Sequence, residues 1–241
     1  MRIKNIQDIK SDFNVQNDLI QSPESGFLQI ERLGIQKDVI LLFLNRILYS
    51  KSRRIPVFLY GGFFGGVNVA SYFSSSFRQD YILRNEPSFF FNTPTLSPNL
   101  ITGIVVCPTP IELMSYVQLK KPDLERTVML CAHPEMPLKN IRQAVEFFPN
   151  AKFTSIFSKA SPYERLKHLS IDMSLQNIPH KIEISSGNVV FHIRKSKISS
   201  SLENINGLYL NKVRRHSKSI VKHMPPPRPF NSYNSILNGT I

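Results

Sequence analysis

The position in this sequence at which catalysis or ligand binding would be expected is the end of a predicted buried strand. Residues 104–107 are apolar and rich in β-branched side chains, which predicts a strand inside a sheet. Pro108 and Pro110 follow, and neither has an N–H to give to a neighbouring strand, so the strand ends there. From Ile111 to Leu119 the apolar residues recur close to helical spacing. In open α/β sheets, ligands and metals bind at the carboxyl end of such a strand. The residue at that end is Pro108, which can neither ligate a metal nor transfer a proton.

Other catalytic and metal-binding patterns are missing from the sequence. It contains no Gly-x-x-x-x-Gly-Lys loop, no Gly-x-Ser-x-Gly turn and no His-Glu-x-x-His helix. The two cysteines, Cys107 and Cys131, lie in apolar runs and do not form a Cys-x-x-Cys pair. We therefore expect two buried, reduced thiols, and His133 alone cannot complete a zinc site with them. These observations predict neither a metal site nor a bound cofactor.

Strands and helices alternate on both sides of this strand end. Strands are predicted at residues 100–107, 126–132 and 151–157, and the helices that follow them at residues 111–120, 138–148 and 162–175. Two further strands, residues 180–185 and 189–194, form a hairpin around a Ser-Gly-Asn turn. This alternation predicts an α/β fold over residues 96–194, with a mostly parallel sheet flanked by helices.

A small α+β domain is predicted to precede that sheet, over residues 26–95. Its elements are two short helices and two strands, at residues 27–33, 39–48, 55–60 and 67–73. Residues 1–25 form a polar segment before it. Turn residues between Pro94 and Pro98 mark the joint between the two domains.

The second half resembles the toprim domain of bacterial primases, topoisomerases and related plasmid and conjugation proteins. In that family a strand leads into a motif like Glu-[Gly/Ser]-Pro-Ile-Asp-Ala-Leu-Ser, and residues 108–115 here read Pro-Thr-Pro-Ile-Glu-Leu-Met-Ser. The Pro, Ile and Ser match, and Glu112 replaces the Asp. The third strand of the family ends in Asp-x-Asp-x-x-Gly, where residues 156–161 read Ile-Phe-Ser-Lys-Ala-Ser. The first half is similar to the small domain that precedes toprim in many primase-like and mobilisation proteins, so the resemblance covers about residues 25–185.

The resemblance implies a site whose catalytic acids have been replaced. Family members use the Glu at the first strand end as a general acid/base, and the paired Asp holds Mg²⁺ against a phosphodiester. The corresponding positions in this chain are Pro108, Ser158 and Ala160. Glu112 remains as a single carboxylate, and Asp172 is the nearest later acid but lies too far along the next helix to reach. We therefore expect no metal-dependent catalysis and no cofactor.

The charge of the chain points to a polyanionic partner. Its net charge is +13 and its sequence pI is near 9.9. Residues 195–241 have few apolar positions and a Pro-rich stretch near their end, which predicts a basic tail without stable structure of its own. We predict electrostatic, weakly sequence-specific binding of nucleic acid through cations in and just before this tail. The predicted residues are Arg194, Lys195, Lys197, Lys212, Arg214, Arg215, Lys218 and Lys222.

The leading hypothesis is a non-catalytic, toprim-like accessory protein of plasmid or mobile-element DNA metabolism. A replication or conjugation protein is a candidate partner. One alternative is an active primase or nuclease that uses Mg²⁺ with displaced acids, in which Glu112 would take part. A second alternative is a protein-interaction module without DNA binding. The most apolar run, residues 39–48, is about half of the roughly 20 residues that a membrane span needs, and no secretory leader is visible. We therefore expect a cytoplasmic protein.

Overall fold

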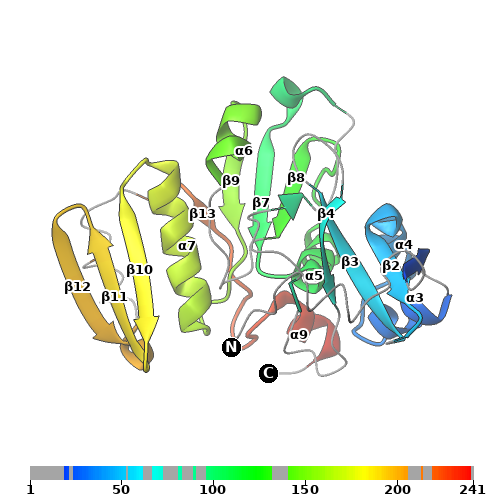
Figure 1. Cartoon of the computed structure of the whole chain (residues 1–241). Helices are drawn as coiled ribbons and strands as arrows, with labels where there is room; N and C mark the ends of the chain where they lie inside the picture. The colour runs from blue at the N-terminus through cyan, green and yellow to red at the C-terminus, as the bar shows by residue number, and fades with distance from the viewer. Residues whose placement is uncertain are drawn as a thin grey trace.

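A mixed β-sheet with helices on both faces forms the body of the protein (Figure 1). The computed structural model describes residues 19–21, 24–52, 54–61, 67–72, 81–82, 89–90, 96–131, 141–205, 213 and 219–239. Within them ten strands form this main sheet, and three more form a separate antiparallel sheet at one end. No helix in these ranges combines the length and the apolar content needed to cross a bilayer.

Four parallel strands form one half of the main sheet, and the sequence predicted the first three of them. They are β7 (Gly103–Cys107), β8 (Thr127–Cys131), β9 (Lys152–Ser155) and β13 (Lys222–His223), in the spatial order β8-β7-β9-β13. Ile104 and Val106 of β7 face one side of the sheet, whereas Val105 and Cys107 face the other, and all four are buried. Burial on both faces explains the continuous apolar run. The predicted α/β fold with a parallel sheet is therefore confirmed.

Helices α5 (Pro110–Lys120), α6 (Ile141–Phe147) and α7 (Pro162–Leu175) accompany the parallel strands. Each of the two helices that follow β7 and β9 begins at a hydroxyl cap with a proline in its first turn. Thr109 Oγ1 accepts the N–H of Glu112 at 3.2 Å, and Ser161 Oγ accepts the N–H of Glu164 at 3.3 Å. Such caps satisfy backbone donors that a helix start leaves unpaired. The predicted bounds of α7 agree with the structure, and α5 begins one residue earlier than predicted.

The N-terminal half continues the same sheet with antiparallel strands. Its elements are β1 (Leu19–Gln21), α3 (Glu24–Glu31), α4 (Lys37–Leu42), the 3-10 turn η1 (Leu44–Arg46), β2 (Ile47–Ser50), β3 (Ile55–Gly61), β4 (Val67–Tyr72), β5 (Tyr81–Ile82) and β6 (Phe89–Phe90). Strand β6 pairs with both β3 and β8, and the 3-10 turn η2 (Pro98–Leu100) leads into β7. The sheet therefore runs unbroken between the two halves of the chain.

The helix predicted at residues 39–48 is too long. Helix α4 ends at Leu42, and Ile47 to Ser50 form β2 instead. Ile47 is fully buried and pairs with Phe58 of β3. Pairing with a strand that follows in the sequence overrides the helical spacing of the local apolar residues.

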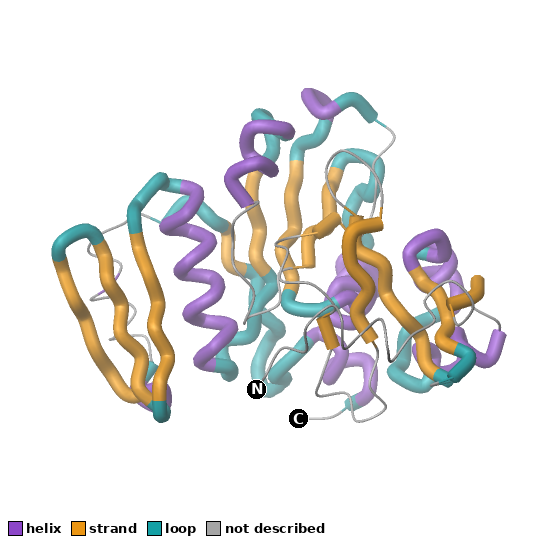
Figure 2. Tube along the Cα trace, in the orientation of Figure 1, coloured by secondary structure: helices purple, strands orange, loops and turns teal. Residues whose placement is uncertain are grey.

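The small sheet is built from β10 (His180–Ser185), β11 (Asn188–Ile193) and β12 (Ser196–Ser201), followed by the 3-10 turn η3 (Leu202–Asn204). Its inner face packs on α7 through the buried side chains of Val189, Phe191 and Ile193. Leu166 of α7 contacts this cluster, whereas Ile171 belongs to the core of the main sheet. Helix α7 thus lies between the two sheets (Figure 2).

The prediction of a tail without structure is wrong for the described part of residues 195–241. This part contributes β12, β13 and a last helix, α9 (Tyr233–Asn238). The carboxylate of Asp172 on α7 accepts the N–H groups of Ile220 and Val221, at 2.8 and 3.2 Å, and so holds the chain at the start of β13. The composition argument considered the segment alone, but neighbouring elements order it.

Helix α9 joins the two halves of the chain. Tyr233 is almost fully buried, and its ring meets that of Tyr116 edge-on with centroids 5.3 Å apart. The side-chain amide of Asn234 donates to the Leu33 carbonyl at 3.0 Å and to Ser115 Oγ at 3.1 Å. One short helix therefore contacts both α5 and the turn after α3.

Replacing Gly34 with alanine should destabilise the protein more than the same change at Gly187. Both glycines have a positive φ, +80° and +77°, so each substitution costs about 1 kcal/mol or more in backbone strain. A Cβ at Gly34 would also lie 3.0 Å from Leu237 Cβ of α9, whereas at Gly187 it meets nothing within 4 Å. We expect urea unfolding to show a further loss of about 1 to 2 kcal/mol for Gly34→Ala. Equal losses would contradict the packing of α9 on this turn.

Candidate functional site

The carboxyl edge of the parallel sheet brings together the positions that the toprim resemblance singles out. Val106 of β7 pairs with Ser155 of β9, so the residues after each strand emerge at the same edge. Pro108 is buried there, and Ser158 is only 5% exposed. The Ser158 hydroxyl accepts the N–H of Ala160 at 3.0 Å. None of the three side chains at the predicted catalytic positions carries a carboxylate.

Glu112, the acid that remains in the motif, caps the start of α9. Its two carboxylate oxygens accept the N–H of Tyr233 at 2.7 Å and the N–H of Asn234 at 3.1 Å. Burial of the carboxylate raises the pKa of Glu112, and the hydrogen bonds from Tyr233, Asn234 and Ser232 act in the opposite direction. The residue that the resemblance places beside the catalytic acid therefore serves to fasten the C-terminal helix.

A second carboxylate, Glu164, reaches the same edge from the first turn of α7. Its Oε2 accepts the N–H of Ser158 at 2.6 Å. The pKa of Glu164 is raised to about 7, mainly by burial, while the hydrogen bond from Ser158 lowers it and the charge of Glu112 raises it. Sequence analysis did not single out Glu164. The Ser-x-x-Glu pattern from Ser161, directly after the third parallel strand, is the signal that could have indicated an acid at this helix start.

The residues at this edge do not fit the magnesium ion that the toprim resemblance implies. Magnesium needs oxygen ligands in near-octahedral positions, commonly from one or two carboxylates. Here both carboxylates already accept backbone N–H groups, and Asp172 does the same on the side of β13. In the described part of the chain, no three His, Cys, Asp or Glu side chains gather as a metal site would require.

The two cysteines end neighbouring strands at this edge. Cys107 pairs with Cys131 in the register of β7 and β8, and their sulfur atoms are 3.3 Å apart. Both are free and buried, as predicted. The Cys107 thiol also lies within hydrogen-bond distance of the Leu130 carbonyl at 3.3 Å.

Exposed cations gather on the outer face of the small sheet. Lys181, His192 and Lys197 are register partners and form one row across β10, β11 and β12. Arg194 and Lys195 form the exposed turn between β11 and β12. Sequence analysis predicted Arg194, Lys195 and Lys197 as binding residues, and the structure brings them together with a lysine that it missed. Lys181 precedes the basic stretch in the sequence, and strand register alone places it in this row.

Glu183 is the one acid on this outer face among the described residues. Its carboxylate pairs with Lys181 at 2.7 Å and with His192 at 3.2 Å. The hydrogen bond from Lys181 is the largest cause that lowers the pKa of Glu183, and the bond from His192 lowers it further. The face thus carries four permanent cations, Lys181, Arg194, Lys195 and Lys197, against this one carboxylate.

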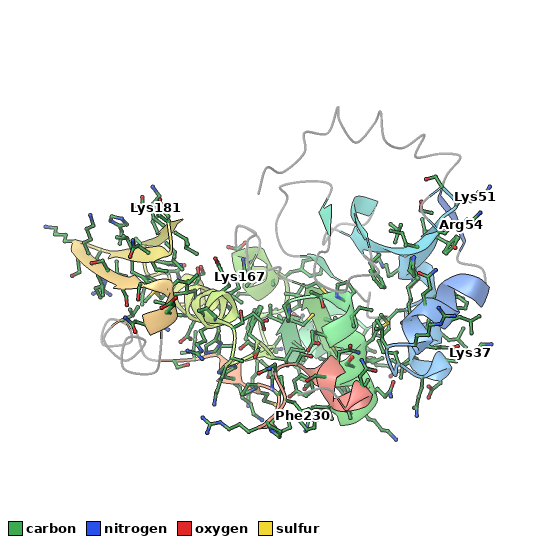
Figure 3. All side chains as sticks on the ribbon, turned by 90° about the horizontal axis from the view of Figure 1, so that it is seen from below. Lys37, Lys51, Arg54, Lys167, Lys181 and Phe230 are labelled. Atoms are coloured by element: carbon green, nitrogen blue, oxygen red, sulfur yellow. The ribbon has the colours of Figure 1, made fainter. Side chains whose placement is uncertain are left out.

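The remaining predicted binding residues do not join this face. Lys222 lies on β13 and, with Lys152, lines a cleft of about 560 Å³ near the start of β9. Four other predicted residues lie outside the described residues: Lys212, Arg214, Arg215 and Lys218. A different group of cations, Lys37, Lys51 and Arg54, lies at the opposite end of the molecule from Lys181 (Figure 3).

The chain is similar in structure to the crystal structure of the primase fragment of the bacteriophage T7 primase-helicase protein. The match covers 94% of this chain and 74% of that chain, with a TM-score of 0.51 and 13% sequence identity. The fold is primase-like. At this identity the likeness speaks for the fold alone, and the predicted toprim-like sheet agrees with it. No protein-family model and no curated protein matches the sequence.

Glu164→Gln should remove a pH dependence of stability between about pH 4.5 and pH 7. In this window the folded protein retains the Glu164 proton, whereas the unfolded chain, with a pKa of 4.5, releases it. The stabilising contribution of the raised pKa is present below pH 4.5 and is lost as the pH rises through 7. Glutamine keeps an acceptor oxygen for Ser158 and does not titrate. The variant should therefore gain stability relative to wild type as the pH rises, by about 1 to 3 kcal/mol at pH 8.

The measurement is urea unfolding of both proteins between pH 4 and pH 8. Burial also lowers the pKa of Lys167 to about 7, but Lys167 is common to both proteins, so the difference between the two curves isolates Glu164. Glu203→Gln, an exposed change on η3, is the control for removing an acid. Parallel curves for wild type and Glu164→Gln would contradict the enclosed position of this carboxylate.

Proposed function

We propose that this protein is a non-catalytic, toprim-like accessory factor of plasmid or mobile-element DNA metabolism, and that it binds nucleic acid electrostatically. The primase-like fold supports a role in DNA metabolism. The observation that carries the non-catalytic assignment is the engagement of both edge carboxylates, Glu112 and Glu164, by backbone N–H groups. A replication or conjugation protein would be the partner through which such a factor acts.

Phosphoryl transfer places demands that this edge does not meet. The reaction depends on cations that neutralise charge developing on the phosphate, and carboxylates must be free to hold them. Pro108 and Ala160 offer no ligand, and the Ser158 hydroxyl is already bonded. Releasing Glu112 would leave the first N–H groups of α9 without their acceptor, at a cost of about 1 to 3 kcal/mol. Folding and metal binding therefore compete for the same acid.

Nucleic acid binding is assigned to the outer face of β10, β11 and β12, which we call the basic face. It comprises the four exposed cations Lys181, Arg194, Lys195 and Lys197. Cations of this kind bind phosphates and release condensed counterions, which gives affinity without sequence preference. The basic face is anchored on α7 by its buried inner side, so its cations are held on a rigid element.

The double variant Lys181→Gln/Lys197→Gln should weaken nucleic acid binding by about tenfold or more at 50 mM salt. Each lost phosphate contact should also make the salt dependence shallower by about one. The matched control is Lys37→Gln/Lys51→Gln, which removes the same charge at the other end of the molecule. Fluorescence anisotropy with a labelled DNA measures both. Equal weakening by the two variants would mean that net charge, and not the basic face, determines binding. Substitutions are needed here because deleting residues 195–241 would also remove β12, β13 and α9.

The wild-type protein should show no magnesium-dependent DNA cleavage and no primer synthesis. An active enzyme with displaced acids is the second candidate, because Glu112 and Glu164 both lie at the carboxyl edge of the sheet. Glu112→Gln separates the two functions. Glu112 caps α9, and glutamine cannot accept both N–H groups of the helix with its one oxygen. The substitution should therefore lower the free energy of unfolding by about 1 to 3 kcal/mol. Activity in wild type that disappears in Glu112→Gln, but persists in the exposed control Glu146→Gln, would establish the active enzyme instead.

A further inference from the structure

The basic face has a definite size and shape. Its three strands have six residues each, so the face is about 20 Å long, and neighbouring strands lie about 4.8 Å apart. The stems of Lys181 and Lys197, two strands apart in one row, are therefore separated by about 10 Å. Arg194 and Lys195 form the turn at the end of the sheet nearest to this row. The result is a strip whose positive charge is distributed over its width and gathered at one end of its length.

The other side chains of this face are small, and most are polar. By strand alternation, the outer face also carries Ser185, Asn188, Ser199 and Ser201, with the half-buried Val190 at its centre. The aromatic residue of this sheet, Phe191, points inward and is fully buried against α7. In the described residues, the basic face therefore has no Phe, Tyr or Trp ring, and the imidazole of His192 is bonded to Glu183. Proteins that bind single strands without sequence preference combine a basic groove with aromatic rings on which bases stack. This face has the charge and lacks such a stacking platform.

A double helix suits such a strip better than a single strand does. Its bases are already stacked on one another, so a protein gains affinity mainly from phosphates. A duplex also presents one charge per about 1.7 Å of its axis, against one per about 3.4 Å for each strand. Over any given length, a duplex therefore offers about twice as many phosphates as one of its strands. Cations spread over two strand separations can reach phosphates on both strands.

We propose that the basic face binds double-helical nucleic acid through its phosphates, in preference to single strands and without reading sequence. This inference rests on the proposed function and specifies its substrate class. Glu183 moderates the binding, because its carboxylate pairs with Lys181 and His192 within the row. Neutralising it leaves all four cations in place and removes the charge that repels phosphate.

The test is fluorescence anisotropy of the full chain with a 20-base-pair DNA duplex, an RNA duplex and the 20-nucleotide single strand, from 50 to 200 mM salt. We expect at least one duplex to bind about tenfold tighter than the single strand at 50 mM salt. Four phosphate contacts predict a slope of log affinity against log salt of about −3 to −4, which is about a hundredfold loss across this range. The two duplex arms identify which helix the protein prefers. Glu183→Gln should tighten duplex binding severalfold, and the matched control Glu146→Gln, which neutralises an exposed acid on α6, should change it less than twofold.

The outcomes separate this inference from the function on which it rests. Binding of the single strand as tightly as both duplexes, or tighter, would overturn the duplex preference and leave electrostatic nucleic acid binding intact. No binding of any probe at 50 mM salt would overturn the proposed function itself. Unchanged or weaker duplex binding by Glu183→Gln would show that the row of Lys181, His192 and Lys197 is not the contact surface.

Discussion

The hydrogen bonds from the start of α9 to the carboxylate of Glu112 hold the C-terminal helix against the main sheet and the N-terminal half of the chain. A helix start leaves several N–H groups unpaired and carries partial positive charge, so a carboxylate beside it is stabilising. Through this contact, α5 of the parallel sheet holds a helix that lies 121 residues further along the chain. The same helix bonds to the Leu33 carbonyl of the N-terminal half. Glu112 and Asn234 together thus connect three distant parts of the sequence.

The polar residues buried around α7 follow the same principle. Asp172 accepts two N–H groups before β13, and the Ser155 hydroxyl lies 2.6 Å from Nδ1 of His168. The ring of His168 stacks on that of His223 at 4.2 Å, and His223 bonds to the Phe157 carbonyl at 2.8 Å. Buried polar groups are costly unless they are paired, and here the pairing joins α7, β9 and β13. These side chains position the fourth parallel strand, whose two residues could not hold their place by backbone pairing alone.

Local patterns in the sequence predicted the elements whose causes are local. The apolar run before Pro108 predicted β7, and a proline in the first turn predicted the start of α7. The features that sequence analysis missed depend on residues far away in the chain. The segment after residue 195 is held in place by hydrogen bonds to carboxylates on α5 and α7. The position of Lys181 in the basic face follows from strand register. Neither a composition nor a spacing contains such information, because each describes a segment without its neighbours.

The carboxylates at the edge of the main sheet and the cations on the small sheet differ in whether the fold already uses them. A catalytic metal site requires carboxylates that remain free after folding, and at this sheet edge folding engages both of them. A new acid at position 158 or 160 would not be enough, because Glu112 would still be bonded to α9. Chemistry would require that α9 release its cap at the same time, which opposes the contact that closes the molecule. The cations of β10, β11 and β12 face no such conflict, since they are exposed and their sheet is held by its apolar inner face. The binding proposed for these cations is therefore compatible with the fold, whereas a metal site at the edge would compete with the cap of α9 for Glu112.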